Sequence, residues 1–421
     1  MQNQSGQPRP HLFKNVSWLL SVEGAAKLSR FATILAMAAF LTAPEYGLVA
    51  LCLAIHDIFR LLLRAGSGTQ VIQCEEHKLR RFSQNAAAIQ WLLCLLLALL
   101  QFGLAPLFAA FSNMPEASQL LQLMALSYLF YPSVSIKVFM LHRTHRFKEF
   151  SLLSGVCFIA ENLLIPLLLW LDVGIMSVAY AKVFSAALWF ILFSRVNIAT
   201  FGVDFHLSTM KLLIKTSSFL LLTELSRSVK QHSDVFIAVK LMTPEIFGLY
   251  TFAKTASLGI SQSFITAFHG AVLPYMSQKN RVGGEPFSKQ VIWASVLLSL
   301  IFTVQALSAP IYVPLLFGDN WHNAILSCSI LCLSAIPSLW MDTYCCSLRA
   351  KAEYNIELII RIIALVTFVL AMLMFSLESP VDFAIFVTTA TALTTLLMPS
   401  LYRLINSQIF SKNVYPNRSK L

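Results

Sequence analysis

The sequence has few charged residues and no long polar stretch. Of its 421 residues, 12% are charged and 57% are hydrophobic, and the mean hydropathy is +0.70. Soluble domains carry about 25% charged residues, so this composition excludes an ordinary soluble protein and leaves no segment for a separate soluble domain. The eight cysteines form no CxxC pair and lie mostly in apolar runs. They are typical of reduced core residues, and we expect no metal site.

Catalytic signatures are missing as well. The sequence contains no G-x-x-x-x-G-K-[ST], H-E-x-x-H or G-x-S-x-G motif, which argues against a P-loop ATPase, a zinc peptidase or a serine hydrolase. We therefore expect no enzymatic activity and no catalytic residue. The net charge of +11 comes mainly from short loops between apolar runs. This pattern favours an anionic lipid surface as the partner and does not indicate nucleic acid. The first apolar run is too long for a cleavable signal peptide.

Apolar runs long enough to cross a bilayer recur along the whole chain. A spanning helix needs roughly 20 mostly apolar residues. The runs lie at 15–41, 46–72, 84–109, 117–141, 150–171, 174–194, 212–242, 246–272, 290–315, 322–347, 356–377 and 380–405. They predict an all-α polytopic membrane protein of about twelve transmembrane helices.

Lysine and arginine segregate to alternate loops between these runs. The basic loops hold Arg9, Lys14, Lys78, Arg80, Arg81, Arg143, Arg146, Lys148, Arg195, Lys211, Lys279, Arg281, Lys289, Arg349, Lys351, Arg403, Lys412, Arg418 and Lys420. The other loops hold acidic residues such as Glu45, Glu116 and Asp319, and no lysine or arginine. The nearest exception is Lys240, which lies just inside the outer end of the seventh run. The positive-inside rule therefore predicts a multi-pass protein with both termini in the cytoplasm.

The two halves of the chain repeat each other. A gap-free offset of 201 residues pairs Glu23 with Glu224 and Gly47 with Gly248, and "TAPEYG" faces "TPEIFG" just before the second pair. Each half holds six apolar runs, so the repeats are parallel and related by an axis along the membrane normal. We expect two six-helix lobes, residues 1–205 and 206–421, around a central cavity that is accessible to each side of the membrane in turn.

Ionisable residues inside the apolar runs gather on the first, second, seventh and eighth runs. Such residues are costly in a membrane and usually face a cavity or a partner. The predicted substrate-binding cations of the cavity are Lys27, Arg30, Arg60, Arg227, Lys230 and Lys254. The candidates for ion coupling or ion pairing are Glu23, Asp57, Glu224, Asp234, His56 and His269.

These charges have two interpretations. Arg227 with Glu224, and the corresponding pairs Lys27–Glu23 and Arg60–Asp57, are spaced to form ion pairs that only hold helices together. Alternatively, the excess of cations at matching positions of both halves suits an anionic substrate, because arginine can hold two phosphate oxygens at once. Four further residues stand alone in their runs: Glu161, Lys182, Asp342 and Arg361. Any of them is a candidate proton or ion site, but the pattern is more typical of buried pairs or of residues at helix ends.

Four segments carry a resemblance to a known family: "LMTPEIFGLYTFAKTASLGISQSFITAFHGAVLPYMSQ" (241–278), "PLLFGDNWHNA" (314–324), "TAPEYGLVAL" (42–51) and "LHRTHRFKEF" (141–150). They resemble the Wzx-type flippases of bacterial polysaccharide units, the O-antigen and exopolysaccharide translocases of the multidrug/oligosaccharidyl-lipid/polysaccharide (MOP) superfamily. The resemblance implies a MATE-like, V-shaped cavity in a bacterial inner-membrane protein. The substrate would be an oligosaccharide on undecaprenyl diphosphate, moved from the cytoplasmic to the periplasmic leaflet and held by the predicted cations.

The resemblance also implies partners and leaves alternatives open. Besides the lipid-linked glycan and membrane lipids, a polysaccharide polymerase and a chain-length regulator are candidate partners, and coupling would use H⁺ or Na⁺ with no other cofactor. An ion-coupled exporter of another small molecule from the same superfamily would favour acidic cavity residues. A membrane polymerase or ligase would need a long outside loop with catalytic arginine or histidine, and the longest outside loop in this topology carries neither.

Overall fold

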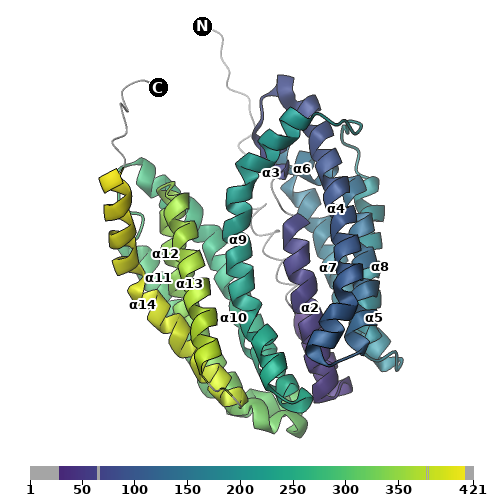
Figure 1. Ribbon diagram of the computed structural model, residues 1–421, viewed down its shortest axis with the longest axis vertical. Coiled ribbons are helices and arrows are strands. Elements are labelled where there is room, and N and C mark those ends of the chain that lie inside the picture. The colour runs from purple at the N-terminus through teal and green to yellow at the C-terminus, as the bar shows by residue number, and fades with distance from the viewer. Residues whose placement is uncertain (1–27, 64–66, 376, 378, 413–421) are drawn as a thin grey trace. The chain divides into compact units, whose positions relative to one another are not determined.

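The computed structural model describes residues 28–63, 67–375, 377 and 379–412, and every regular element in this part of the chain is a helix (Figure 1). A short helix, Leu28–Phe40, is followed by α2 (Ala43–Leu63), α3 (Ser67–Gln73), α4 (Glu76–Ser112), α5 (Glu116–Ala125), η1 (Leu126–Phe130), α6 (Pro132–Arg143), α7 (Phe147–Trp170), α8 (Met176–Ser194), α9 (Leu207–Leu241), α10 (Pro244–Arg281), α11 (Lys289–Phe317), η2 (Asp319–Ala324), α12 (Ile325–Ala350), α13 (Tyr354–Met374) and α14 (Pro380–Lys412). The prediction of an all-α membrane protein is confirmed.

Each predicted apolar run from the second onward overlaps an observed helix, and the first run lies partly outside the described residues. Among the described helices, eight are long and apolar enough to cross a membrane, or nine if the bent pair α5–η1 and α6 is one span. Helix α9 carries too many charged residues to qualify by composition. The count of twelve spans therefore stays a prediction.

The predicted run 117–141 is broken in the structure. Helix α6 begins at Pro132, and it is bent by 56° relative to the preceding segment α5–η1. Proline has no N–H to continue the preceding helix, but it is well suited to the first position of a new one. The apolar composition of the run hid this break, although Pro132 marks it in the sequence.

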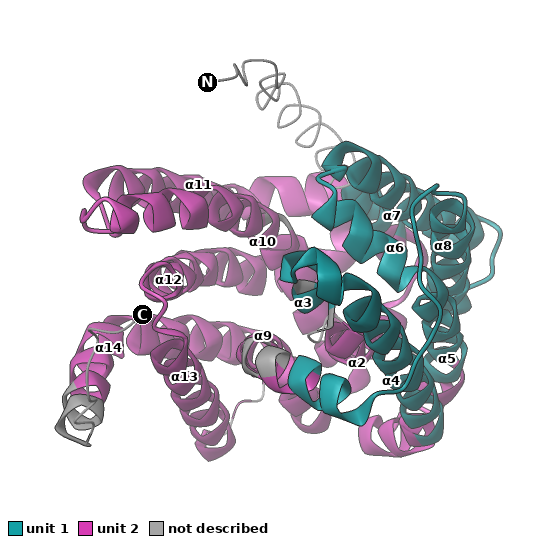
Figure 2. Cartoon of the chain, turned by 90° about the horizontal axis from the view of Figure 1, so that it is seen from above, with its two compact units in different colours: residues 1–36, 67–103, 120–213 teal, residues 37–66, 104–119, 214–421 magenta. Residues whose placement is uncertain are grey.

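The described helices belong to two compact units (Figure 2). Unit 1 comprises residues 1–36, 67–103 and 120–213, and unit 2 comprises residues 37–66, 104–119 and 214–421. In unit 1, α7 packs against α8 and α3 packs against α6. In unit 2, α10, α11 and α14 all pack on α12, and α2 packs on α10. The predicted division into lobes 1–205 and 206–421 stays a prediction.

Helices α2 and α10 approach each other closely at the two glycines that the internal repeat pairs. A Cβ atom on Gly248 would lie 1.9 Å from the carbonyl oxygen of Ala43, and one on Gly47 would lie 2.7 Å from the ring of Phe247. Only glycine lets two backbones approach this closely. The Pro-Glu-Tyr-Gly segment of α2 and the Pro-Glu-Ile-Phe-Gly segment of α10 thus meet each other within unit 2.

Three of the four segments that carry the family resemblance, 42–51, 241–278 and 314–324, also lie in unit 2. The ring of Trp321, from the "GDNW" segment, stacks on Phe252 with centroids 4.0 Å apart, and Tyr46 lies edge-on to both rings. The indole N–H of Trp321 donates a hydrogen bond to the Ala38 carbonyl oxygen at 2.9 Å. This aromatic cluster ties the start of α10 to the chain before α2.

Candidate functional site

A polar cavity lies within unit 2, among helices α9, α10, α12, α13 and α14. It has a volume of about 90 Å³, enough for a few water molecules. Its charged lining residues are Arg227, Lys230, Asp234, Lys254, Asp342 and Arg361. Serine, threonine and glutamine side chains, including Ser226, Ser334, Gln262 and Thr391, lie between them. Three of the six predicted cations therefore line one cavity.

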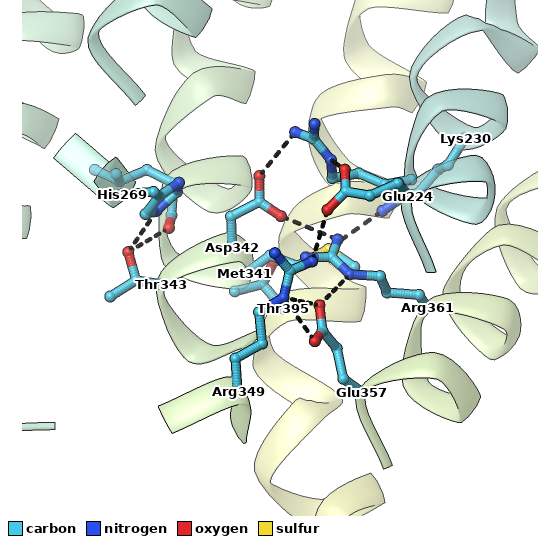
Figure 3. Close-up of polar contacts among 12 residues, drawn as sticks. Glu224, Lys230, His269, Met341, Asp342, Thr343, Arg349, Glu357, Arg361 and Thr395 are labelled. Atoms are coloured by element: carbon cyan, nitrogen blue, oxygen red, sulfur yellow. Dashed lines mark hydrogen bonds and ion pairs between the residues drawn. The ribbon is translucent and has the colours of Figure 1, made fainter. Parts of the chain in front are cut away.

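One side of this cavity is bordered by ion pairs between α12 and α13 (Figure 3). Arg361 donates from Nη1 to Asp342 at 3.0 Å and from Nε to Glu357 at 2.9 Å. Arg349 donates from Nε to both oxygens of Glu357, at 3.0 and 2.8 Å. Arg361 and Glu357 are both buried, and their opposite charges compensate the cost of removing each from water.

The same pairs continue to α9 and close a ring. Arg349 Nη2 donates to Glu224 at 2.8 Å, and Arg227 Nε donates to the other oxygen of Glu224 at 3.1 Å. Arg227 Nη1 lies 3.9 Å from Asp342, which completes the circuit. This ionic ring alternates three arginines with three carboxylates and is neutral. The pairing of Arg227 with Glu224, one of the two interpretations of the sequence, is present in the structure.

A second neutral group joins α9 to α10. The Lys254 ammonium lies 2.6 and 2.7 Å from the two carboxylate oxygens of Asp234 and 2.6 Å from the carbonyl oxygen of Gln231. The Tyr250 hydroxyl also donates to Asp234, whose exposed fraction is 2%. Three oxygens around one ammonium use all of its donors. The charge of Lys254 is therefore already neutralised.

Lys230 differs from the other cations of the cavity. Its Nζ lies 3.5 Å from the sulfur of Met341 and 5.7 Å from the ring centroid of Phe368. Within the described residues, no carboxylate oxygen lies within 4.0 Å of this ammonium. The ionic ring, the Lys254–Asp234 pair and Lys230 together hold five cations and four carboxylates, so one positive charge is in excess. That charge is on Lys230.

The remaining predicted site residues lie elsewhere or outside the described chain. Lys27 and Glu23 fall outside the described residues, and Arg30 is exposed in unit 1. On α2, His56 is buried, Asp57 is exposed and Arg60 is half-buried, and these three are not among the lining residues of this cavity. His269 of α10 lies 3.2 Å from the hydroxyl of Thr343, measured from its Nε2. Their predicted roles stay predictions.

The sequence interpretation missed two members of the ionic ring and explained two others correctly. Asp342 and Arg361 form the expected kind of pair, as do Glu161 and Lys182, whose ammonium and carboxylate are 2.6 Å apart. Arg349 had been assigned only to a cytoplasmic loop, and Glu357 had no predicted role. The i, i+4 spacing of Glu357 and Arg361 was a usable signal, whereas the Arg349 contact depends on how α12 and α13 pack.

In the described part of the chain, no group of three or more histidine, cysteine, aspartate or glutamate side chains could hold a metal ion.

Residues 36–326 match the sequence profile of a family described as polysaccharide biosynthesis protein. A curated relative, the succinoglycan biosynthesis transport protein ExoT of Rhizobium meliloti (strain 1021), is 25% identical over 330 residues. The alignment covers 76% of this chain and 65% of the relative, so the chain spans just under two thirds of that protein's length.

Solved transporter structures share the fold. The lipid II flippase MurJ, in an inward closed conformation, superposes with a TM-score of 0.76 at 12% identity, covering 96% of this chain and 94% of MurJ. An inward-facing multidrug resistance MATE family transporter of the MOP superfamily gives 0.66 at 14% identity, covering 94% and 96%. Together with the profile match over more than half of the sequence, these likenesses show that this chain is a multi-pass membrane protein with the fold of MOP-superfamily transporters, and that it belongs to the polysaccharide biosynthesis protein family.

Proposed function

We propose that this protein moves oligosaccharide units linked to undecaprenyl diphosphate from the cytoplasmic to the periplasmic leaflet of the bacterial inner membrane. The family assignment, the succinoglycan transport relative and the fold shared with a lipid II flippase support a lipid-linked glycan as the substrate. The observation that carries the proposal is the excess cation Lys230 in the polar cavity of unit 2.

The cavity suits one part of such a substrate. At about 90 Å³ it is too small for an oligosaccharide, but its size fits a phosphate group that displaces a few water molecules. An ammonium that has no carboxylate partner gains a charge-assisted hydrogen bond when a phosphate oxygen arrives. Ser226, Gln262 and Ser334 offer hydroxyl and amide groups for sugar hydroxyls nearby. We assign the unit 2 cavity as an anion subsite of the transport pathway.

The neutral groups have a different role in this proposal. Asp342 and Glu224 already form ion pairs with Arg227, and Asp234 forms one with Lys254. A substrate anion would have to displace a bound carboxylate to reach either cation, which leaves an uncompensated charge behind. Lys230 can bind an anion without that cost. Of the three predicted substrate-binding cations that line the unit 2 cavity, the proposal therefore retains only Lys230.

An exporter of another small molecule is the main alternative, because MATE-family transporters share the fold. The excess charge in the cavity separates the two proposals: a cation exporter would need an excess of carboxylates, and the unit 2 cavity group has one excess cation.

We also propose that both termini are cytoplasmic and that a polysaccharide polymerase and a chain-length regulator act on the flipped units. A phosphatase that is active only in the periplasm should show no activity when it is fused to the C-terminus. An active fusion would contradict this orientation.

Deleting the gene tests the proposed function. Lipid-linked units should accumulate on the cytoplasmic side and the surface glycan should disappear. Wild-type protein should restore the glycan, as should a control variant with Lys211→Gln, because Lys211 is exposed at the start of α9. Lys230→Gln should not restore it. Normal surface polysaccharide in the deletion strain, with no second flippase present, would rule out the proposal.

A further inference from the structure

A second and larger cavity lies on unit 2, away from the charged residues described above. It is formed by the α10–α11 connection, α12 and α14 and has a volume of about 500 Å³. Four aromatic side chains contribute to its walls: Phe287, Trp340, Tyr344 and Tyr402. This volume falls in the range of about 300–1,000 Å³ that small-molecule sites occupy. We call it the aromatic groove.

Three polar side chains that line the aromatic groove are already hydrogen-bonded within the protein. The Trp340 indole N–H donates to the Ser299 hydroxyl at 3.2 Å, and the Tyr402 hydroxyl donates to Glu353 at 3.2 Å. The Thr395 hydroxyl donates to the Pro337 carbonyl oxygen at 3.1 Å. A ligand inside the groove therefore meets mainly ring faces and aliphatic carbon, which favours an apolar chain over a sugar.

One residue that lines the aromatic groove also belongs to the hydrophobic outer surface of the helices. Helices α11 and α14 each pack on α12 and lie on either side of it (Figure 2). Leu396, which lines the groove on α14, is 76% exposed, and Leu297 on α11 is 63% exposed. In a protein that spans a bilayer, such exposed leucine faces contact lipid. The groove therefore opens where acyl chains are present.

Two side chains of opposite charge stand at the rim of the groove. Lys351 lies in the α12–α13 connection and Glu285 in the α10–α11 connection, and both are exposed. Neither belongs to an ion pair among the described residues. A cation and an anion at one rim complement a headgroup that carries both a phosphate and an ammonium.

We propose that the aromatic groove binds a membrane phospholipid with a phosphoethanolamine headgroup. Lys351 holds the phosphate, Glu285 accepts hydrogen bonds from the ammonium, and one acyl chain lies along Trp340 and Tyr344. The lipid fills the space between the α10–α11 connection, α12 and α14 and so stabilises the packing of α14 on α12. This site is separate from the Lys230 cavity, and the proposal does not depend on the transported substrate.

Binding is measured on the delipidated full-length protein in detergent. Phosphatidylethanolamine, phosphatidylcholine and phosphatidylglycerol with the same acyl chains are compared by thermal unfolding and by native mass spectrometry. Phosphatidylethanolamine should raise the unfolding temperature most and stay bound best. Phosphatidylcholine has no ammonium N–H to donate, and phosphatidylglycerol has no cation to pair with Glu285. Equal effects of the three lipids, or strongest binding of phosphatidylglycerol, would overturn the proposal.

Variants locate the site. Lys351→Glu and Glu285→Lys should each abolish the preference for phosphatidylethanolamine, and the double variant, which exchanges the charges, should restore it. Lys211→Glu, at an exposed position of unit 1, should leave the preference unchanged and serves as the matched control. An unchanged preference in both single variants would place the lipid elsewhere and overturn the proposal.

The acyl chain is located by fluorescence. A brominated chain on phosphatidylethanolamine should quench tryptophan emission in the wild-type protein, and Trp340→Phe should remove most of the quenching that saturates at low lipid concentration. If Trp340→Phe leaves that quenching unchanged, the chain does not lie in the aromatic groove. Both results are independent of transport, so they remain informative whatever the substrate of the transporter proves to be.

Discussion

Two lysines, one in each compact unit, have different surroundings within their helices. In unit 1, the Lys182 ammonium lies 2.6 Å from the Glu161 carboxylate, and the two side chains are 13% and 9% exposed. In unit 2, the Lys230 ammonium contacts the sulfur of Met341 and faces the ring of Phe368. Both lysines sit inside long helices, but only Lys182 has a carboxylate close to its charge in the described chain.

This difference separates structural charges from charges available to a ligand. Breaking a buried pair leaves one uncompensated ion and is strongly destabilising. A cation without a carboxylate partner contributes no such pair to the fold, and it keeps its charge for an incoming anion. By the same reasoning, Arg227 and Lys254 are structural charges like Lys182, although Arg227, Lys230 and Lys254 look equivalent in the sequence.

The largest expected effect comes from comparing Lys182→Met with Lys230→Met. Lys182→Met removes the ammonium that lies 2.6 Å from Glu161 and should destabilise the protein by about 3–5 kcal/mol. Lys230→Met breaks no ion pair among the described residues and should change stability by less than about 1 kcal/mol, or increase it, while abolishing transport. Thermal unfolding of the purified variants measures the first effect, and surface glycan measures the second.

A double variant provides the control for this comparison. Adding Glu161→Leu to Lys182→Met removes both charges and should recover most of the lost stability, because a buried pair can be replaced by apolar side chains at little cost. If Lys230→Met unfolds as readily as Lys182→Met, the distinction between the two lysines is wrong.

A second test exchanges charges within the ionic ring of unit 2. Glu224→Arg together with Arg227→Glu conserves the pair itself, but it sets the new cation beside Arg349 and the new carboxylate beside Asp342. The double variant should therefore be destabilised by roughly 2–3 kcal/mol, less than a fully buried pair because Arg227 is 40% exposed. If the double variant unfolds at the same temperature as the wild-type protein, the ring contacts of Arg349 and Asp342 do not contribute to stability.

Much of the fold could be predicted from the sequence because hydropathy sets the membrane-spanning helices directly. The charged stripe of α9 was also readable, because Glu224, Arg227 and Asp234 repeat at helical spacing. The break at Pro132 was missed because the apolar run continues through it. Which cation is in excess could not be predicted, since Arg349 joins the ring only through tertiary packing of α12 on α13.

A third and smaller effect separates packing from charge in unit 2. Gly248→Ala would drive a Cβ into the backbone of Ala43, whereas Gly47→Ala meets the ring of Phe247. Gly248→Ala should cost about 1–3 kcal/mol and Gly47→Ala less, because a ring can shift more easily than a backbone. Gly270→Ala, with open space around it, is the matched control and should be neutral or slightly stabilising. Equal unfolding temperatures for all three variants would contradict the close approach of α2 and α10.

Binding of undecaprenyl diphosphate to the purified protein tests the role of Lys230 most directly. The wild-type protein, Lys230→Arg, Lys230→Gln and the paired-lysine control Lys254→Arg are compared by titration in nanodiscs. A charge-assisted hydrogen bond contributes about 1.5–3 kcal/mol, so Lys230→Gln should weaken binding by roughly 10–100-fold, while Lys230→Arg should retain most of the affinity. Lys254→Arg should bind as tightly as the wild type. If Lys230→Gln binds undecaprenyl diphosphate with unchanged affinity, the excess cation is not the anion subsite.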